Sequence, residues 1–303
     1  MDSKRISKET GRFIGWVGLN FSSLIIRFVP SCYIYGFASS MSFIWYRIAA
    51  KQRNIAIESL TIAFGKEKSR EEIKRISEDC FVFIAKAGLE LMFLMRRPKL
   101  LEARVEMEGR DNLERALSRG RGVILVSAHF GNFPLMMARL ALSGYKIAGI
   151  MRPMHDMRAE KMFMKMRTDL GIKTIYAQPR ITCVNKTIEA LRNNELVFIP
   201  IDQNFGSGGV FVDFFGTKAA TATGPVVLAQ RTKAALLPCF IIRQPDDTHK
   251  IVFEPAIELK EGKNSEETVL MNIQRLTNII EEYIRRYPAE WGWIHRRWKS
   301  KPS

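Results

Sequence analysis

From Val105 onward, short apolar runs of strand length alternate with amphipathic runs of helix length. Such alternation is typical of an α/β domain, because neighbouring parallel strands are joined through a helix that crosses one face of the sheet. We therefore expect a mainly parallel central sheet flanked by helices. In chain order, the expected elements are a strand at 122–127, a helix at 135–143, a strand at 146–151, helices at 159–170 and 184–193, strands at 196–202, 234–243 and 250–253, and a closing helix at 265–286.

The segment before this domain, residues 54–97, has the pattern of helix. Its first part breaks at Gly65. Ser69, followed three positions later by Glu72, then predicts a capping box that opens a long amphipathic helix. The apolar residues of this second helix predict that it packs against the rest of the fold.

The N-terminal region contains two runs without a charged residue, at 13–26 and 28–46. A spanning helix needs about 20 predominantly apolar residues, and polar residues dilute both runs, so three arrangements stay open: one marginal span, a helical hairpin in the membrane interface, and a buried pair of core helices. Cations and aromatic residues at the edges suit anchoring at the interface. The region lacks a small-residue cleavage site after a short apolar stretch, which argues against a removed signal peptide. We expect residues 1–53 to form membrane-associating helices and residues 54–303 to form the α/β domain.

The chain carries 47 Lys and Arg residues against 31 Asp and Glu residues, which gives a formal charge of +16. A charge of this sign predicts an anionic partner: a membrane leaflet, an acidic carrier protein or a nucleic acid. The basic residues are scattered and form no recognition motif, so we expect no nucleic-acid partner. The four cysteines are widely spaced and include no CxxC pair, which predicts neither a metal site nor a disulfide framework.

A histidine, His129, stands just beyond the expected strand at 122–127. Ligands of open α/β sheets bind at the carboxyl ends of strands. A histidine there can take the proton from a hydroxyl that attacks a thioester, since its reference pKa is roughly 6.5. By position alone, a structural role is the commoner outcome for a lone histidine. Gly131 and Asn132 favour a functional role, because they permit close backbone approach and a helix N-terminus that attracts an anion.

Several short blocks of sequence follow one another through nearly the whole chain. They are Ser127-Ala-His129-Phe-Gly131-Asn132-Phe133, Met151-Arg152-Pro153, Ile201-Asp202-Gln203-Asn204, and the segments 209–216, 220–225 and 291–298. In this order the blocks resemble the lipid A biosynthesis (lauroyl/myristoyl) acyltransferase family, within the wider glycerolipid acyltransferase superfamily. The resemblance implies a glycerolipid acyltransferase-like fold without a cofactor. It also implies transfer of a fatty acyl group from an acyl carrier protein or coenzyme A thioester to a hydroxyl of a lipid A precursor or related lysolipid, at the cytoplasmic face of the bacterial inner membrane.

One position departs from the family pattern, which has an acidic residue five positions after the histidine where this chain has Pro134. Such an acid would hydrogen-bond the second imidazole nitrogen, fix the tautomer and stabilise the imidazolium. Asp202 is the first candidate to replace it, because it ends an expected strand much as His129 does. A turn or cap role for Asp202 is an equal alternative. A backbone carbonyl, the Asn132 side chain or a weakened activity are the other possibilities.

The resemblance also implies a set of substrate-binding residues. Arg152 follows the strand at 146–151, where a guanidinium can bind the phosphate of a lipid headgroup or of the carrier's prosthetic arm. Without the resemblance, a surface arginine in a turn would be the simpler interpretation. Gln203 and Arg297 lie in matching blocks, and with Gly131 and Asn132 they complete the expected set.

With His129 as general base, the nucleophile is the substrate's own hydroxyl. Backbone amides near Gly131 and Asn132, or Arg152, are then expected to stabilise the developing oxyanion. The chain has no Gly-x-Ser-x-Gly motif, which argues against a serine hydrolase. The alternative is a lipid-binding accessory protein that keeps the fold but has lost turnover with the acid at position 134. In that case, replacing His129 would leave its biological role intact.

Overall fold

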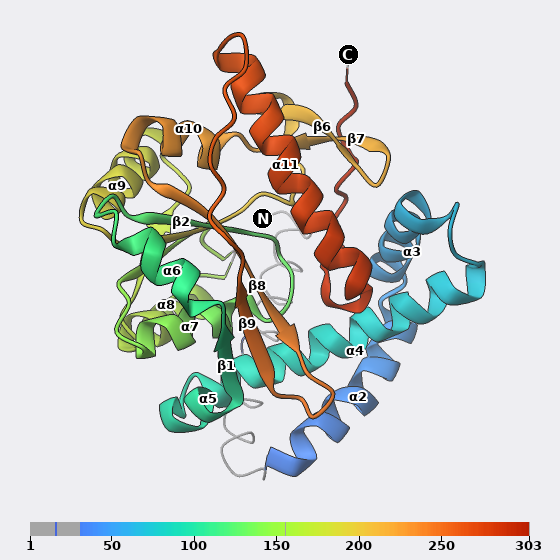
Figure 1. The fold of residues 1–303 in the computed structure, drawn as a ribbon. Coiled ribbons are helices and arrows are strands. Elements are labelled where there is room, and N and C mark those ends of the chain that lie inside the picture. The colour runs from blue at the N-terminus through green and yellow to red at the C-terminus, as the bar shows by residue number, and fades with distance from the viewer. Residues whose placement is uncertain (1–15, 17–30, 155, 303) are drawn as a thin grey trace, which may run out of the picture.

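The computed structural model describes residues 16, 31–154 and 156–302 (Figure 1). Apart from Trp16, the first uncharged run at 13–26 lies outside the described residues, as does the start of the second run.

Among the described residues, seven strands form the central sheet in the order β1-β9-β8-β2-β5-β3-β4. All neighbouring pairs are parallel except β8 and β9, which form an antiparallel hairpin. The predicted α/β fold with a mainly parallel sheet is thus confirmed. The strands are β1 Val105–Glu108, β2 Val123–Ser127, β3 Ile147–Met151, β4 Ile172–Tyr176, β5 Leu196–Pro200, β8 Ala235–Arg243 and β9 His249–Phe253.

Helices cover both faces of the sheet, and alternate residues of β2 point into two separate cores. Ile124 and Val126 belong to one core, and Val123 and Leu125 belong to the other. A strand buried on both faces is apolar throughout, which explains the continuous run that predicted it. The helices are α2 Ser31–Ile48, α3 Ala50–Phe64, α4 Arg70–Leu94, α5 Pro98–Arg104, α6 Arg110–Leu117, α7 Phe133–Leu142, α8 Met157–Asp169, α9 Arg180–Arg192, α10 Gly224–Thr232 and α11 Ser265–Arg286.

A small antiparallel hairpin stands apart from the main sheet and packs against α11 (Figure 1). It consists of β6 Val210–Phe214 and β7 Thr217–Thr221. The hairpin contains most of the family block at 209–216, and its Phe214 lies buried against the tryptophans near the C-terminus. This packing brings the last block of the sequence back toward the centre of the fold.

Helix α2 forms from the second uncharged run and packs against α4. Its buried positions, Ile34, Ala38 and Ser42, are four residues apart and therefore share one face. No helix in the described part of the chain is both long and apolar enough to cross a membrane. Membrane association of residues 1–53 stays a prediction. The large apolar side chains of α2 that are exposed are Tyr33, Phe37, Met41, Phe43, Ile44 and Ile48.

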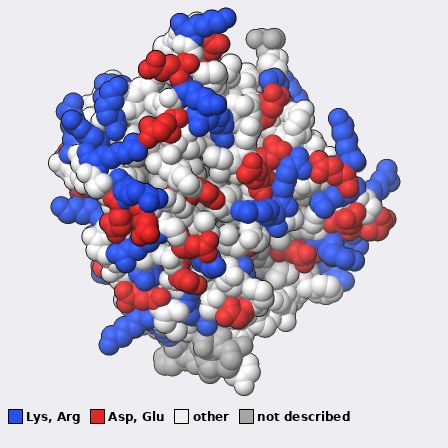
Figure 2. Space-filling view, viewed as in Figure 1, with Lys and Arg blue, Asp and Glu red and all other residues white. Residues whose placement is uncertain are grey.

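Charged side chains of both signs are mixed over the surface shown in Figure 2. Lys and Arg lie among Asp and Glu, so on this face the excess of cations is not gathered into one continuous stripe. A stripe of cations is what an extended nucleic-acid backbone would require.

Helix α4 begins with the predicted capping box. The Ser69 hydroxyl accepts from the Glu72 backbone N–H at 3.2 Å, and the Glu72 carboxylate accepts from the Ser69 N–H at 2.8 Å. The helix then runs beside α2 toward the carboxyl end of the central strands (Figure 1). Its start is thus defined by local sequence, while its later turns build part of the site described below.

Replacing Ser69 with alanine should lower the free energy of unfolding by about 1 kcal/mol, because the first turn of α4 loses one side of its capping box. Urea-induced unfolding measures this difference. Ser265→Ala is a matched control, since Ser265 is exposed in the first turn of α11, where Asn264 supplies the cap. Equal losses in the two variants would contradict the capping role.

Candidate active site

The register between β2 and β5 brings His129 and Asp202 together. Ser127 pairs with Pro200 in this parallel ladder, and the Ile201 backbone N–H donates to the Ser127 carbonyl at 3.1 Å. His129 and Asp202 each lie two residues beyond this last pair. Their proximity was expected from the sequence, and it follows directly from parallel pairing at the carboxyl edge of the sheet.

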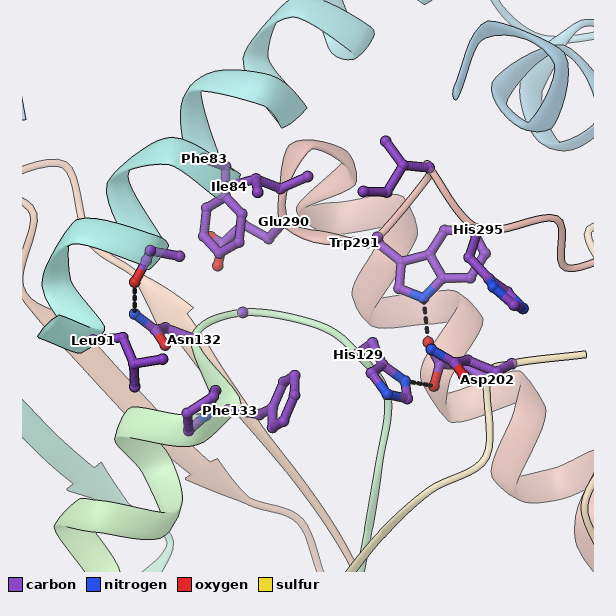
Figure 3. A pocket seen from close by; sticks show the side chains of 17 residues that line it. Phe83, Ile84, Leu91, His129, Asn132, Phe133, Asp202, Glu290, Trp291 and His295 are labelled. Atoms are coloured by element: carbon purple, nitrogen blue, oxygen red, sulfur yellow. Dashed lines mark hydrogen bonds and ion pairs between the residues drawn. The ribbon is translucent and has the colours of Figure 1, made fainter. Parts of the chain in front are cut away.

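His129 and Asp202 are hydrogen-bonded to each other (Figure 3). His129 Nδ1 lies 2.9 Å from Asp202 Oδ1, and the Trp291 indole N–H donates to Asp202 Oδ2 at 2.7 Å. The Asp202 side chain is 2% exposed and the His129 side chain is 34% exposed. The carboxylate is therefore sealed inside the fold, whereas the imidazole remains open to the pocket. Asp202 thus gives the imidazole the carboxylate partner that Pro134 cannot supply.

The electrostatics of this pair favour an ionised carboxylate beside a basic imidazole. Burial pushes the pKa of Asp202 upward, but the charge and hydrogen bond of His129, together with the Trp291 indole, outweigh it and leave the pKa lowered. Burial pushes the pKa of His129 downward, but Asp202 outweighs it and leaves the pKa raised. Because a carboxylate can only accept, Nδ1 carries the proton and donates it. The other ring nitrogen, Nε2, is then free to act as a base.

The pocket beside His129 has a volume of about 370 Å³. One wall is apolar and comes from α4, where Ile84, Gly88 and Leu91 recur at helical spacing on one face. The polar side chains of the lining come from other segments of the chain. The lining residues are Phe83, Ile84, Ala87, Gly88, Leu91, His129, Gly131, Asn132, Phe133, Pro134, Asp202, Gln203, Glu290, Trp291, Gly292, Ile294 and His295.

Gly131 is required by the backbone at the turn after His129. Its φ is +59°, and a Cβ built there would lie 1.9 Å from the Ile241 carbonyl oxygen. The Gly131 N–H donates to the Glu290 carbonyl at 2.9 Å. The expectation that this amide stabilises an oxyanion needs correction, because the amide already has an acceptor. Gly131 instead allows the turn to pack closely against β8.

Asn132 lines the pocket, but its side-chain nitrogen points into the protein. Nδ2 donates to the Ala87 carbonyl at 3.2 Å and to Glu90 Oε2 at 3.0 Å. Asn132 stands at the N-cap of α7 without making a side-chain cap hydrogen bond. Pro134 occupies the first turn of α7, where its missing N–H is not needed.

The other expected substrate-binding residues lie in different environments. Gln203 is exposed and lines the pocket. Arg152 is exposed at the carboxyl end of β3, outside the residues that line the pocket. Arg297 is only 1% exposed. Its guanidinium donates to the carbonyls of Gln203 and Ala220 and to the Thr221 hydroxyl. The prediction that Arg297 binds substrate is therefore corrected: it fastens the loop after β5 to β7.

Trp291 is a site residue to which the sequence assigned no role in the site. The segment around it pairs with the turn that carries the histidine, through a bridge between Phe130 and Trp291 and a bond from the Gly292 N–H to the His129 carbonyl at 3.2 Å. This pairing aims the indole at Asp202. The only signal in the sequence was the family block at 291–298, which did not show which side chain faces the carboxylate.

A second histidine, His295, also lines the pocket. Its Nε2 accepts from the Asn204 backbone N–H at 3.2 Å, and burial lowers its pKa. Both observations favour a neutral imidazole that holds the loop after Asp202. Within the described residues, no group of three or more His, Cys, Asp and Glu side chains is arranged to hold a metal ion.

Glu290 is a pocket residue that the sequence did not single out. It is 8% exposed, and its two carboxylate oxygens share one donor, the Arg243 backbone N–H, at 3.2 and 3.1 Å. The Arg243 guanidinium binds Glu90 and Asp247 instead. Burial raises the pKa of Glu290 to about 7.

Glu290→Gln should make stability less sensitive to pH. The folded protein binds a proton at Glu290 with a pKa of about 7, against an ordinary value of 4.5 in the unfolded chain. The wild type therefore loses stability as pH rises from about 4.5 through about 7, by roughly 3 kcal/mol from this group. The glutamine variant lacks this loss. Urea unfolding at pH 5 and pH 8 measures the difference, with the exposed Glu266→Gln as control. An unchanged pH dependence in Glu290→Gln would contradict the assignment.

The sequence model of the family described as bacterial lipid A biosynthesis acyltransferase matches residues 2–300. Individual relatives share less than a third of their residues with this chain. The lipid A biosynthesis palmitoleoyltransferase of Escherichia coli strain K12 is 28% identical over 262 residues, which cover 83% of this chain and 80% of that protein. The lipid A biosynthesis lauroyltransferase of the same strain is 24% identical over 306 residues, which cover 96% and 93%.

A third relative carries a different name. The phosphatidylinositol mannoside acyltransferase of Mycobacterium tuberculosis is 27% identical over 194 residues, which cover 63% of this chain and 58% of that protein. The names of the three relatives have acyl transfer in common: two name lipid A with different acyl groups, and the third names a phosphatidylinositol mannoside.

Proposed function

The chain belongs to the bacterial lipid A biosynthesis acyltransferase family, and from this premise we propose that it moves a fatty acyl group from an acyl thioester to a hydroxyl of a lipid A precursor or related lysolipid, with His129 as general base. The hydrogen bond from His129 to the buried Asp202 is the observation that carries this proposal. A base held in one tautomer by a sealed carboxylate, and open on its other nitrogen, has the arrangement that general-base catalysis requires.

The proposed reaction needs only the chain's own side chains. Nε2 of His129 takes the proton from the acceptor hydroxyl while the hydroxyl oxygen attacks the thioester carbonyl carbon. The carbon–sulfur bond then breaks, and the imidazolium returns the proton to the leaving thiolate. Asp202 stabilises the imidazolium through Nδ1, and Trp291 keeps the carboxylate in position.

The tetrahedral intermediate places a negative charge on the former carbonyl oxygen. Since the Gly131 amide is engaged, the backbone N–H groups of Asn132 and Phe133 at the start of α7 are the donors we assign to this charge. The N-terminus of a helix also carries a partial positive charge. Arg152, at the same edge of the sheet, is assigned to a phosphate of the acceptor or of the donor's prosthetic arm.

The apolar wall from α4 suits the acyl chain, because alkyl groups gain about 0.8 kcal/mol for each buried methylene. The exposed apolar residues of α2 suit a membrane surface, and the +16 charge suits an anionic leaflet or an acidic carrier protein. We therefore propose that the enzyme works at the cytoplasmic face of the inner membrane with an acyl carrier protein or coenzyme A thioester as donor.

His129→Ala should lower the rate of acyl transfer by about 10²- to 10⁴-fold, because the acceptor hydroxyl loses its base. The assay uses detergent-purified protein, labelled acyl-carrier-protein and acyl-coenzyme A donors, and a panel of lipid acceptors. An active wild type whose rate is unchanged in His129→Ala would refute the assignment. A wild type that binds lipid but is inactive on the whole panel would favour a lipid-binding accessory protein.

Asp202→Asn should lower the rate by a comparable factor, on the order of 10²- to 10⁴-fold, with little loss of stability. The asparagine amide can donate to Nδ1 and so place the imidazole proton on Nε2, where it blocks the base. Glu195→Gln is the matched control, since Glu195 is 3% exposed, lies just before β5 at the opposite edge of the sheet and pairs with Lys173. Activity lost equally in both variants would point to general damage rather than to the dyad.

A further inference from the structure

The turn after His129 is tied to α4 through the side chain of Asn132 (Figure 3). Asn132 is 3% exposed, and Nδ2 donates to the Ala87 carbonyl and to the Glu90 carboxylate. Ala87 lines the pocket, whereas Glu90, three positions later on α4, is 1% exposed and is not a lining residue. The catalytic turn and the apolar wall of the pocket are thus joined by a buried hydrogen-bonded amide.

Glu90 is the centre of a buried ionic cluster. The Arg243 guanidinium donates to its two oxygens at 2.8 and 2.7 Å, and His249 Nε2 lies 3.1 Å from both. Burial alone would raise the pKa of Glu90, but His249 and Arg243 outweigh it and hold the pKa at about 2. The carboxylate therefore stays ionised at neutral pH and can only accept hydrogen bonds.

The amide of Asn132 consequently has one permitted orientation. Both groups that face its side chain, the Ala87 carbonyl and the Glu90 carboxylate, are acceptors, so the nitrogen must point toward them. Oδ1 then points the other way. No described residue donates a hydrogen bond to Oδ1. Oδ1 is also absent from the buried polar atoms that lack a partner, so the atom is accessible rather than buried. Since Asn132 lines the pocket, this oxygen is open to a ligand there.

We propose that Glu90 is a positioning residue for acyl transfer: it holds the Asn132 amide so that Oδ1 accepts a hydrogen bond from an N–H or O–H group of the substrate. The proposal rests on the acyltransferase function proposed above. Two substrate groups have this chemistry, the hydroxyl of the lipid acceptor and an amide N–H of the donor's pantetheine arm. Glu90 acts only through Asn132, because its own carboxylate does not reach the pocket.

The test is a double-mutant cycle with the full chain in the acyl-transfer assay. Asn132→Ala should lower kcat/KM by about tenfold, as expected for one lost hydrogen bond. Glu90→Gln should cause a similar loss, because a glutamine can donate toward Oδ1 and let the Asn132 amide turn over. The double variant should be no worse than Asn132→Ala alone, within about twofold. Losses that multiply to about 100-fold, or a wild-type kcat/KM in Asn132→Ala, would overturn the proposal.

Two further variants separate positioning from stability. Asp247→Asn removes a different charge from the same cluster, where Asp247 binds Arg243 and Lys86 but not Asn132. It should keep wild-type kcat/KM even if its melting temperature falls. Glu90→Asp keeps the negative charge of the cluster, but its carboxylate is one methylene shorter and withdraws from Asn132 as well as from Arg243 and His249. It should repeat the loss seen in Glu90→Gln, and it serves if the glutamine variant does not fold. A wild-type kcat/KM in Glu90→Asp would count against the proposal.

The two substrate groups are distinguished by varying one substrate at a time. A raised KM for the acyl donor alone, at saturating acceptor, assigns Oδ1 to the amide of the donor's arm. A raised KM for the acceptor alone assigns it to the acceptor hydroxyl. An unchanged KM and kcat for both overturns the proposal while leaving the acyltransferase function standing, because the wild-type rate measures that function separately.

Discussion

The parallel pairing of β2 with β5 is the constraint on which the site depends. The register sets Ser127 opposite Pro200, so His129 and Asp202, each two residues further on, lie side by side with Nδ1 2.9 Å from Oδ1. Packing on both faces of the two strands holds the register, since a slip by one residue would turn every side chain to the other face. The next strand, β8, adds a second constraint, because its Ile241 carbonyl leaves room only for glycine at position 131.

Local pattern predicts the centre of the fold well, and long-range contacts explain what it misses. The central strands are apolar throughout, and His129 and Asp202 both follow strand ends, so their meeting could be foreseen. Strand β4 could not be predicted in this way, because Ile172–Tyr176 lies at the edge of the sheet and has polar residues in its middle. The bond from Trp291 to Asp202 spans 89 positions. A sequence block likewise does not show that Arg297 points inward while Gln203 faces the pocket.

With Pro134 at the position where the family resemblance led us to expect an acid, the proposed mechanism takes its carboxylate from Asp202. The imidazole needs an acceptor at Nδ1 that is ionised and held in one orientation, and Asp202 meets this need from the neighbouring strand. Asp202 follows a different strand from His129, so tertiary structure must hold its carboxylate in place. A second donor, the Trp291 indole, contributes to this. Position 134 instead holds a proline, which suits the first turn of α7.

Two buried glutamates near the pocket receive different donors from one arginine, and their pKa values are shifted in opposite directions. The Arg243 guanidinium and His249 serve Glu90, which therefore stays ionised. Glu290 receives only the backbone N–H of the same arginine, and its pKa rises to about 7. Neighbouring carboxyl groups with separated pKa values can fill different roles: one remains a fixed acceptor that orients an amide, while the other can hold a proton at the pocket wall. Of the two, only Glu290 lines the pocket, and its raised pKa means that it can carry a proton there.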